Sequence, residues 1–322
     1  MKLSFVYSQA HILQTGAVAR ACLASGQRGK VLAAFSKAIY LLTDDGEVFW
    51  ITAEDTPLHQ RCAQVSAPLP EFSAGSPFQV EDQRLTIEPG FIFDVDPAPL
   101  WNAPRFDPNH VLEITQLPVR VGAFFSKLDL SQAKEFGFFI PHILSLAHSE
   151  SLDLEPAFTD PILLYAHALV LDIARAGLNQ QPSRIAKNAD ALIGLGAGLT
   201  PSGDDFLGGW LFAVKNLQAA YPDSSFSHYS LPIETYHSRT NLISFTLLND
   251  LASGQAIAPL HYLVNGLLSG ESFESIYPVS SQLAQIGHST GWDMLTGLLT
   301  GMLITFHNPS WRAAKWRSNP YH

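Results

Sequence analysis

The stretch Ile193-Gly194-Leu195-Gly196-Ala197-Gly198-Leu199-Thr200-Pro201-Ser202-Gly203-Asp204-Asp205-Phe206 separates one apolar run of the chain from the next. Its glycines suit a backbone that must adopt positive φ or approach another group closely. Pro201 fits the first turn of a helix, and either Thr200 or Ser202 can cap it, with Ser202 and Asp205 forming a capping box. Apolar residues then recur with helical spacing. The stretch predicts a glycine loop leading into a helix N-terminus, where an anionic group can bind.

This loop differs from the two common phosphate-binding motifs. It lacks the lysine of a P-loop, and the residues before it, 183–192, favour a helix, whereas a dinucleotide-binding fingerprint follows a strand. Asp204 and Asp205 allow two interpretations. They are functional carboxylates, or they are acids that the helix dipole favours in a first turn by about 0.3–1 kcal/mol each. The spacing alone leaves both interpretations open.

Three ordered segments resemble one bacterial family, long known only as a domain of unknown function and now named for a subunit of oxamate carbamoyltransferase (AllH-like). The first segment is the glycine-rich stretch. The other two are Arg239-Thr240-Asn241-Leu242-Ile243-Ser244, with the helix after it, and Gly287-His288-Ser289-Thr290-Gly291-Trp292-Asp293-Met294-Leu295. The resemblance extends over residues 152–307, and the first 120 residues share only the general character of the family.

The resemblance implies a role in oxamate carbamoyltransfer within purine (allantoin) nitrogen catabolism. In that reaction oxalurate and phosphate give oxamate and carbamoyl phosphate, or the reverse, and no covalent intermediate is required. It implies a small anionic substrate and other subunits of a carbamoyltransferase complex as partners. Two alternatives stay open. One is a noncatalytic or regulatory subunit of such a complex, and the other is a metal-dependent hydrolase or lyase (carboxylase-like) that acts on another small carboxylate.

The candidate site residues come from the same three segments. We expect His288, Asp205 and Asp204 to be catalytic, because an imidazole transfers protons near neutral pH and carboxylates orient reacting groups. A guanidinium such as that of Arg239 matches a carboxylate or phosphate through two parallel hydrogen bonds, and loop amides suit a phosphate. The residues expected to bind substrate or anion are Gly194, Gly196, Gly198, Thr200, Ser202, Gly203, Arg239, Thr240, Asn241, Ser289 and Asp293.

The sequence points to no particular cofactor, and whether the site holds a metal is unknown at this stage. Asp204, Asp205, Asp293 and His288 together offer the hard ligands that suit Mg²⁺ or Mn²⁺. Against this, adjacent aspartates seldom bind one ion, and no histidine spacing typical of zinc occurs. Asp293, three residues after Thr290, also fits a capping box.

Two expected helices, at 203–220 and 291–306, each follow a glycine-bearing loop and contain interior glycines. An interior glycine costs about 1 kcal/mol relative to alanine, and a close approach of two backbones explains why it is kept. The glycines concerned are Gly208, Gly209, Gly297 and Gly301. We therefore expect the two helices to cross closely, to bring residues 196–205 beside residues 288–293, and to leave Arg239 at the edge of the shared pocket.

The chain has 322 residues, of which 47% are hydrophobic and 15% charged, as in a globular protein with a well-buried core. The pattern predicts an α+β fold, with a β-rich N-terminal domain over 1–120 and an all-helical C-terminal domain over 121–322 that carries the glycine loop. Strands are expected at 31–42, 47–52, 78–80, 84–87, 91–95 and 111–114, with a hairpin turn at Asp44-Asp45-Gly46. Helices are expected at 121–128, 131–149, 160–177, 183–192, 203–220, 242–253, 258–268, 272–285 and 291–306.

Composition also limits the class of protein. A net charge of −10 argues against a nucleic-acid partner. Cys22 and Cys62 form no C-x-x-C pair, which argues against a thiolate metal site and favours two reduced thiols in a cytoplasmic protein. The first nine residues lack the apolar core of a signal peptide, and the apolar stretch 294–306 is too short to span a bilayer. We expect a cytoplasmic protein with no membrane partner.

Overall fold

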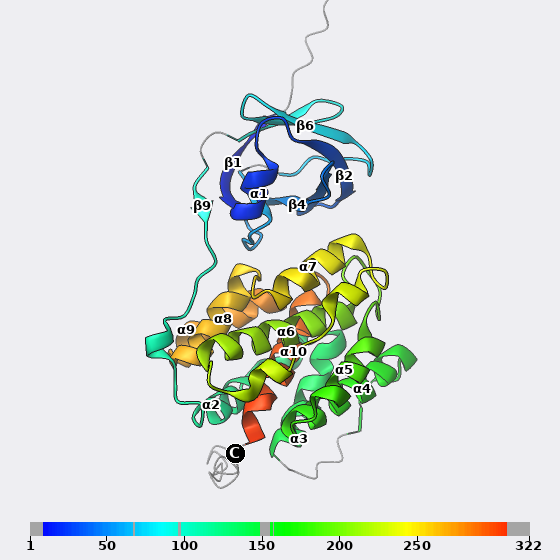
Figure 1. Ribbon diagram of the computed structural model, residues 1–322. Helices are drawn as coiled ribbons and strands as arrows, with labels where there is room; N and C mark the ends of the chain where they lie inside the picture. Colours follow the sequence, from blue (N-terminus) through cyan, green and yellow to red (C-terminus); the bar gives the residue numbers. More distant parts are fainter. Residues whose placement is uncertain (1–8, 67, 96–97, 149–154, 157, 308–322) are drawn as a thin grey trace, which may run out of the picture. The chain divides into compact units, whose positions relative to one another are not determined.

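The computed structural model describes residues 9–66, 68–95, 98–148, 155–156 and 158–307. The chain forms two compact units. One comprises Met1–Pro104 with Gln255–Ala258, and the other comprises Arg105–Gly254 with Pro259–His322. The first unit is built from strands and the second from helices, so the predicted α+β class is confirmed (Figure 1). The limits 1–120 and 121–322 stay predictions for the two folding domains.

The first unit is a sheet that closes on itself. Its strands are β1 (Gln9–Gly16), β2 (Arg28–Ala34), β3 (Ala38–Thr43), β4 (Val48–Ala53), β5 (Cys62–Val65), β6 (Pro77–Glu81), β7 (Arg84–Ile87) and β8 (Phe91–Asp94). They lie in the order β5-β4-β3-β2-β6-β7-β8-β1, and the sheet closes because β1 also pairs with β5. A short ninth strand, β9 (Leu100–Trp101), pairs in parallel with the end of β1. Closure pairs the edges that an open sheet would leave free.

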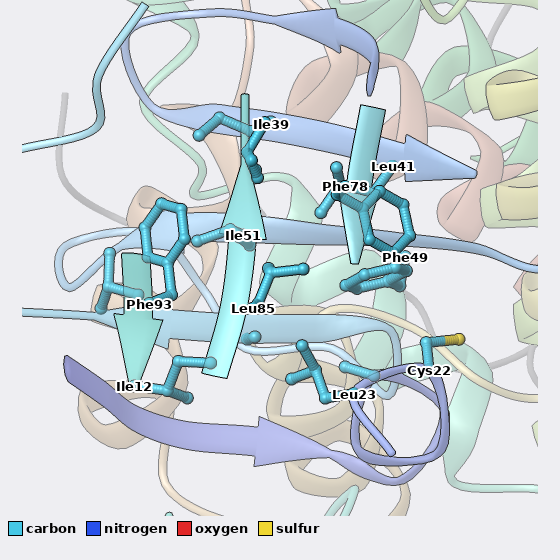
Figure 2. Packing of buried hydrophobic residues seen from close by; sticks show 14 of the residues in the cluster. Ile12, Cys22, Leu23, Ile39, Leu41, Phe49, Ile51, Phe78, Leu85 and Phe93 are labelled. Atoms are coloured by element: carbon cyan, nitrogen blue, oxygen red, sulfur yellow. The ribbon is translucent and has the colours of Figure 1, made fainter. Parts of the chain in front are cut away.

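Apolar side chains fill the interior of this barrel. Buried and exposed residues alternate along β6, where Phe78 and Val80 point inward. Figure 2 shows side chains from several strands pointing toward one another, with Cys22 and Leu23 from the end of the short helix α1 (Ala17–Cys22) packed beside them. The rings of Phe49 and Phe78 meet edge to face, with their centroids 5.8 Å apart. The first unit therefore has its own hydrophobic core.

The strand predictions are partly confirmed. The turn at Asp44-Asp45-Gly46 joins β3 and β4 as expected. The stretch 31–42 is wrong as a single strand, because the chain reverses at residues 35–37, where the Phe35 N–H donates to the carbonyl oxygen of Ala38. The expected strand at 111–114 is also wrong, since that segment has no strand partner and the Leu112 N–H donates to the Leu268 carbonyl. β1 and β5 were not expected.

The second unit contains nine of the α-helices in the described part of the chain. They are α2 (Leu117–Phe125), α3 (Ile140–His148), α4 (Pro161–Leu178), α5 (Pro182–Leu192), α6 (Ser202–Ala220), α7 (Leu242–Ala252), α8 (Ala258–Ser269), α9 (Phe273–Ala284) and α10 (Thr290–Met302). By length and composition α4 could also cross a membrane, a weak criterion that core helices satisfy as well.

Two expected helices differ from those observed. The helix expected at 131–149 is wrong as one piece: the segment folds as the short 3-10 turns η2 (Leu130–Gln132) and η3 (Glu135–Phe139), followed by α3. The break occurs at Glu135, whose φ of 45° is left-handed and cannot continue a helix. Residue 149 lies outside the described residues. The end of the last expected helix tightens into the 3-10 turn η6 (Leu303–His307).

Helices α6 and α10 form the centre of this unit, where Figure 1 shows them side by side. Residues 202–214 of α6 and 291–302 of α10 are all buried. A Cβ atom on Gly297 would lie 1.9 Å from the Phe206 carbonyl oxygen, and one on Gly209 would lie 2.2 Å from the Met294 carbonyl oxygen. The close crossing expected from the interior glycines is therefore confirmed at these two positions.

The crossing should not tolerate a methyl group. Gly297→Ala places a Cβ against backbone, so we expect a loss of at least about 1–3 kcal/mol in the free energy of unfolding, measured by urea denaturation. Gly177→Ala in α4 is the matched control, because its Cβ would meet only an ordinary contact at 3.5 Å. That variant should be neutral or stabilised by about 0.5–1 kcal/mol, as for glycine in a helix interior. Equal stability of the two variants would contradict the tight crossing.

Candidate functional site

The glycine loop between α5 and α6 has the backbone that its sequence predicts. Gly194, Gly196 and Gly198 have φ values of 74°, 119° and 99°. Two of these glycines are also required by the chain's own packing, since a Cβ on Gly194 would lie 2.5 Å from the Arg239 carbonyl oxygen and one on Gly196 would lie 2.8 Å from the Ser202 nitrogen. Gly198 has open space around it. The exposed part of the loop at residues 196–198 is therefore where a ligand can reach the backbone.

The capping boxes expected at both helix N-termini are wrong. Pro201 occupies the N-cap of α6 and Ser289 that of α10, and neither helix has a side-chain cap hydrogen bond. Gly203 lies in the first turn of α6, where a Cβ would come within 2.0 Å of the Leu192 carbonyl oxygen. The acids of the first turns instead accept hydrogen bonds from groups outside their own helices.

Asp204 connects three segments. Its carboxylate accepts hydrogen bonds from the Gly194 N–H at 2.7 Å, from the Thr240 hydroxyl, and from the Ser244 hydroxyl of α7 at 2.6 Å. The side chain is almost completely buried. A buried carboxylate with three donors is well satisfied, so Asp204 holds the glycine loop against the start of α7.

Arg239 and Asn241 are also engaged within the chain. The Arg239 guanidinium forms an ion pair with Asp190 and donates at 2.7 Å to the Asp190 carbonyl, near the C-terminus of α5. Asn241 caps α7 by accepting from the Ser244 N–H and donates to the Leu199 carbonyl at 2.7 Å. The anion beside Arg239 in this structure is therefore an aspartate, and the Asn241 amide holds the loop.

Asp205 and Asp293 form a buried pair of carboxyl groups. Asp205 is 3% exposed and Asp293 is fully buried. The Thr200 hydroxyl donates to Asp205 at 2.8 Å and lies 3.1 Å from the hydroxyl of Thr290, which joins the N-terminal ends of the two helices. Asp293 Oδ1 accepts from the Phe136 N–H at 3.0 Å, while its Oδ2 has no hydrogen-bond partner among the described residues. The two loops are thus adjacent, as the helix crossing predicts.

Burial changes the acidity of this pair. Burial first, and then the Asp293 carboxyl, raise the pKa of Asp205 well above its usual value. Burial raises the pKa of Asp293 to about 7, although the Phe136 N–H and the nearby Ser202 and Ser289 hydroxyls act in the opposite direction. Two neighbouring carboxyls with raised pKa values can hold a proton near neutral pH and release it to a reacting group.

His288 and the candidate metal ligands show fewer contacts that would indicate a role. His288 is exposed and forms no hydrogen bond or ion pair with any described residue. The four residues considered as metal ligands do not converge, because Asp204 faces Thr240 and Ser244, and no group of three or more His, Cys, Asp or Glu suited to a metal occurs within the described ranges.

Several residues of this site were not expected from the sequence. Thr290 lies in the third motif and was noted only as a cap, Ser244 ends the second motif, and Asp190 precedes the loop. These residues could have been predicted from the sequence, because each carries a hydroxyl or carboxyl group within a motif or close to one. The Phe136 N–H had no such signal, because a backbone donor on a distant 3-10 turn has no mark in the sequence.

The carboxyl pair should make stability depend on pH. A carboxyl whose pKa is raised in the folded state stabilises the protein fully below the unfolded pKa of about 4, and this stabilisation is lost as pH rises through the folded pKa. For Asp293, a rise from 3.8 to about 7 corresponds to on the order of 4 kcal/mol. We expect the urea midpoint to fall between about pH 4.5 and pH 7.5.

Asp293→Asn should flatten this fall, because the amide oxygen still accepts from the Phe136 N–H but the group no longer titrates. Asp107→Asn is the control, since Asp107 is an exposed carboxyl whose pKa is lowered by its hydrogen bond to the Asn109 N–H, and it should keep the wild-type slope. An Asp293→Asn slope equal to that of the wild type would contradict the assignment.

Comparison with known protein families finds a match over this part of the chain. The family model described as oxamate carbamoyltransferase subunit AllH matches residues 192–302, which include the glycine loop and the N-termini of α6, α7 and α10. No curated protein and no solved structure matches the chain. The matched segment contains all three motifs on which the resemblance depends. Over residues 192–302 this chain is therefore similar to the family of oxamate carbamoyltransferase subunit AllH.

Proposed function

We propose that this protein is a subunit of a carbamoyltransferase that acts on oxalurate and oxamate with phosphate or carbamoyl phosphate. The family match supports the class of enzyme complex. The observation that best supports this reaction is the buried pair Asp205 and Asp293. Both residues lie within the matched segment, at the adjacent N-termini of α6 and α10. The proposal includes a cytoplasmic location and a place in purine (allantoin) nitrogen catabolism.

The reaction needs a proton at one atom. In phosphorolysis a phosphate oxygen attacks the carbamoyl carbon of oxalurate. The bond from that carbon to the amide nitrogen then breaks, and its electron pair goes to the nitrogen, which takes up a proton to leave as oxamate. An unprotonated amide nitrogen is a poor leaving group. A carboxyl that still holds its proton near neutral pH is suited to supply it.

Asp205 is the member of the pair best placed for this role. Its pKa is raised well above the usual value, so it is neutral where an exposed aspartate is ionised. The hydroxyl of Thr200 contacts its carboxyl, and Thr200 and Thr290 are both half-buried. In this proposal a threonine hydroxyl relays the proton between Asp205 and the leaving nitrogen.

The other two parts of the reaction use the exposed loop and His288. Backbone N–H groups beside a helix N-terminus favour an anion, so the loop at residues 196–198 is proposed to bind phosphate. Charge that develops on the carbamoyl oxygen needs a donor. His288 is proposed to supply it, since it is exposed and close in sequence to the N-terminus of α10.

A second candidate is a noncatalytic subunit whose site is completed by a partner chain. The ion pair between Arg239 and Asp190 supports this candidate. Asp190 already pairs with the guanidinium that we expected, from the sequence, to bind the substrate carboxylate. The word subunit in the family name also implies a complex of more than one chain.

Reconstitution tests both candidates. The chain is assayed alone and with its partner subunits for phosphate-dependent formation of oxamate and carbamoyl phosphate from oxalurate. We expect Asp205→Asn to stay folded and to lose at least tenfold in turnover, which corresponds to about 1.4 kcal/mol. Asp204→Asn should instead lower the free energy of unfolding by about 1–3 kcal/mol, because it disturbs three hydrogen bonds, with turnover per folded molecule kept within a fewfold.

The outcomes separate the candidates. Unchanged turnover of Asp205→Asn in a complex that requires this chain indicates a noncatalytic subunit. Carbamoyl transfer that never appears in any combination of subunits contradicts the proposed reaction.

A further inference from the structure

A cavity of about 480 Å³ lies at the turn between α9 and α10, and the function proposed above does not use it. One wall comes from residues 128–134, before and within the turns that precede α3, and the other comes from α9, the turn after it and the start of α10. Its volume lies within the range of sites for small molecules. Gly287 and Trp292, which line it, belong to the third family motif.

Three polar side chains of this cavity are free to bind a ligand. Lys134 provides the cation, and within the described residues its ammonium forms no ion pair or hydrogen bond. The side-chain amides of Gln132 and Gln285 line the same space and are likewise unpaired in the described ranges. Asp129, by contrast, already accepts from the Ser131 N–H at 2.9 Å. The cavity therefore combines the unpaired positive charge of Lys134 and the hydrogen-bonded carboxylate of Asp129 with two groups that both donate and accept hydrogen bonds.

The cavity wall is connected directly to the buried carboxyl pair. Glu135, next to Lys134, has a φ of 45°, and Phe136, the next residue, donates its N–H to Asp293 at 3.0 Å. The Thr296 hydroxyl donates to the Phe136 carbonyl at 3.0 Å, which fastens the turn to α10. A left-handed non-glycine residue costs about 1–3 kcal/mol and persists where its surroundings hold it. This strained turn places Lys134 in the cavity wall and directs the Phe136 N–H to the Asp293 carboxyl.

We infer that this cavity binds a small carboxylate that carries an amide, with the carboxylate on the Lys134 ammonium and the amide on the side chains of Gln132 and Gln285. Lys134 then takes the role that the sequence suggested for Arg239. The chemical class fits the lining, because a cation matches the carboxylate and an amide side chain pairs with an amide at both its N–H and its oxygen. The choice of oxamate as ligand rests on the proposed function.

Binding of oxamate to the full chain, measured by isothermal titration calorimetry, tests the inference. Lys134→Met should weaken oxamate binding at least tenfold, and Lys134→Arg should recover part of the affinity because it keeps the charge. Lys127→Met is the matched control, since Lys127 is exposed on the same segment but does not line the cavity. Ser281→Trp fills the cavity from its exposed wall and should abolish binding without lowering Tm.

Equal oxamate affinity in Lys134→Met and Lys127→Met would overturn the inference, as would a wild-type chain that binds no oxamate. Inorganic phosphate added in excess should not displace oxamate, and displacement would assign the Lys134 cavity to phosphate instead. The same experiments distinguish a failure of this inference from a failure of the proposed function. Oxamate binding that depends on Lys134 without any carbamoyl transfer contradicts only the reaction, and transfer with oxamate binding independent of Lys134 contradicts only the cavity.

Discussion

The close crossing of α6 and α10 is the contact on which the rest of the helical unit depends. Gly209 and Gly297 allow each helix to approach the backbone carbonyls of the other, at distances that exclude a Cβ atom. The N-termini of the two helices also lie close together, because the Thr200 and Thr290 hydroxyls are 3.1 Å apart. Both helices are buried on all sides over this length, which makes them the core around which the other helices pack.

The same crossing gives two adjacent aspartates different properties. Consecutive residues of a helix point about 100° apart, so Asp204 and Asp205 face different neighbours. Asp204 faces the loop and α7, where three donors satisfy it. Asp205 faces α10, where burial first, and then the nearby Asp293 carboxyl, raise its pKa.

The family match covers the buried carboxyl pair but not all of the residues that contact it. The matched segment ends at residue 302 and begins at residue 192, so it excludes Lys134, Phe136 and the strained turn at Glu135. Those residues nevertheless contact the matched segment through Asp293 and Thr296. Arg239 lies within the match and is held by Asp190 at the end of α5, where the helix dipole favours a positive charge. The surroundings of the buried carboxyl pair thus include a part of the chain that the motifs do not mark.

The sequence by itself determined the α+β class, most helices, the hairpin at residues 44–46, the positive φ of the loop glycines and the helix crossing, because each follows from local periodicity, turn chemistry or the cost of glycine in a helix. The tertiary structure decided the rest. β1 and β5 form because they pair with each other across about 50 residues of chain, which no local pattern reveals. The helix expected at 131–149 breaks at Glu135, whose left-handed backbone lies beside the tertiary hydrogen bond from the Phe136 N–H to Asp293. The pairing of Asp205 with Asp293, and of Arg239 with Asp190, depends on which groups folding brings within reach, and that proximity is absent from the order of residues along the chain.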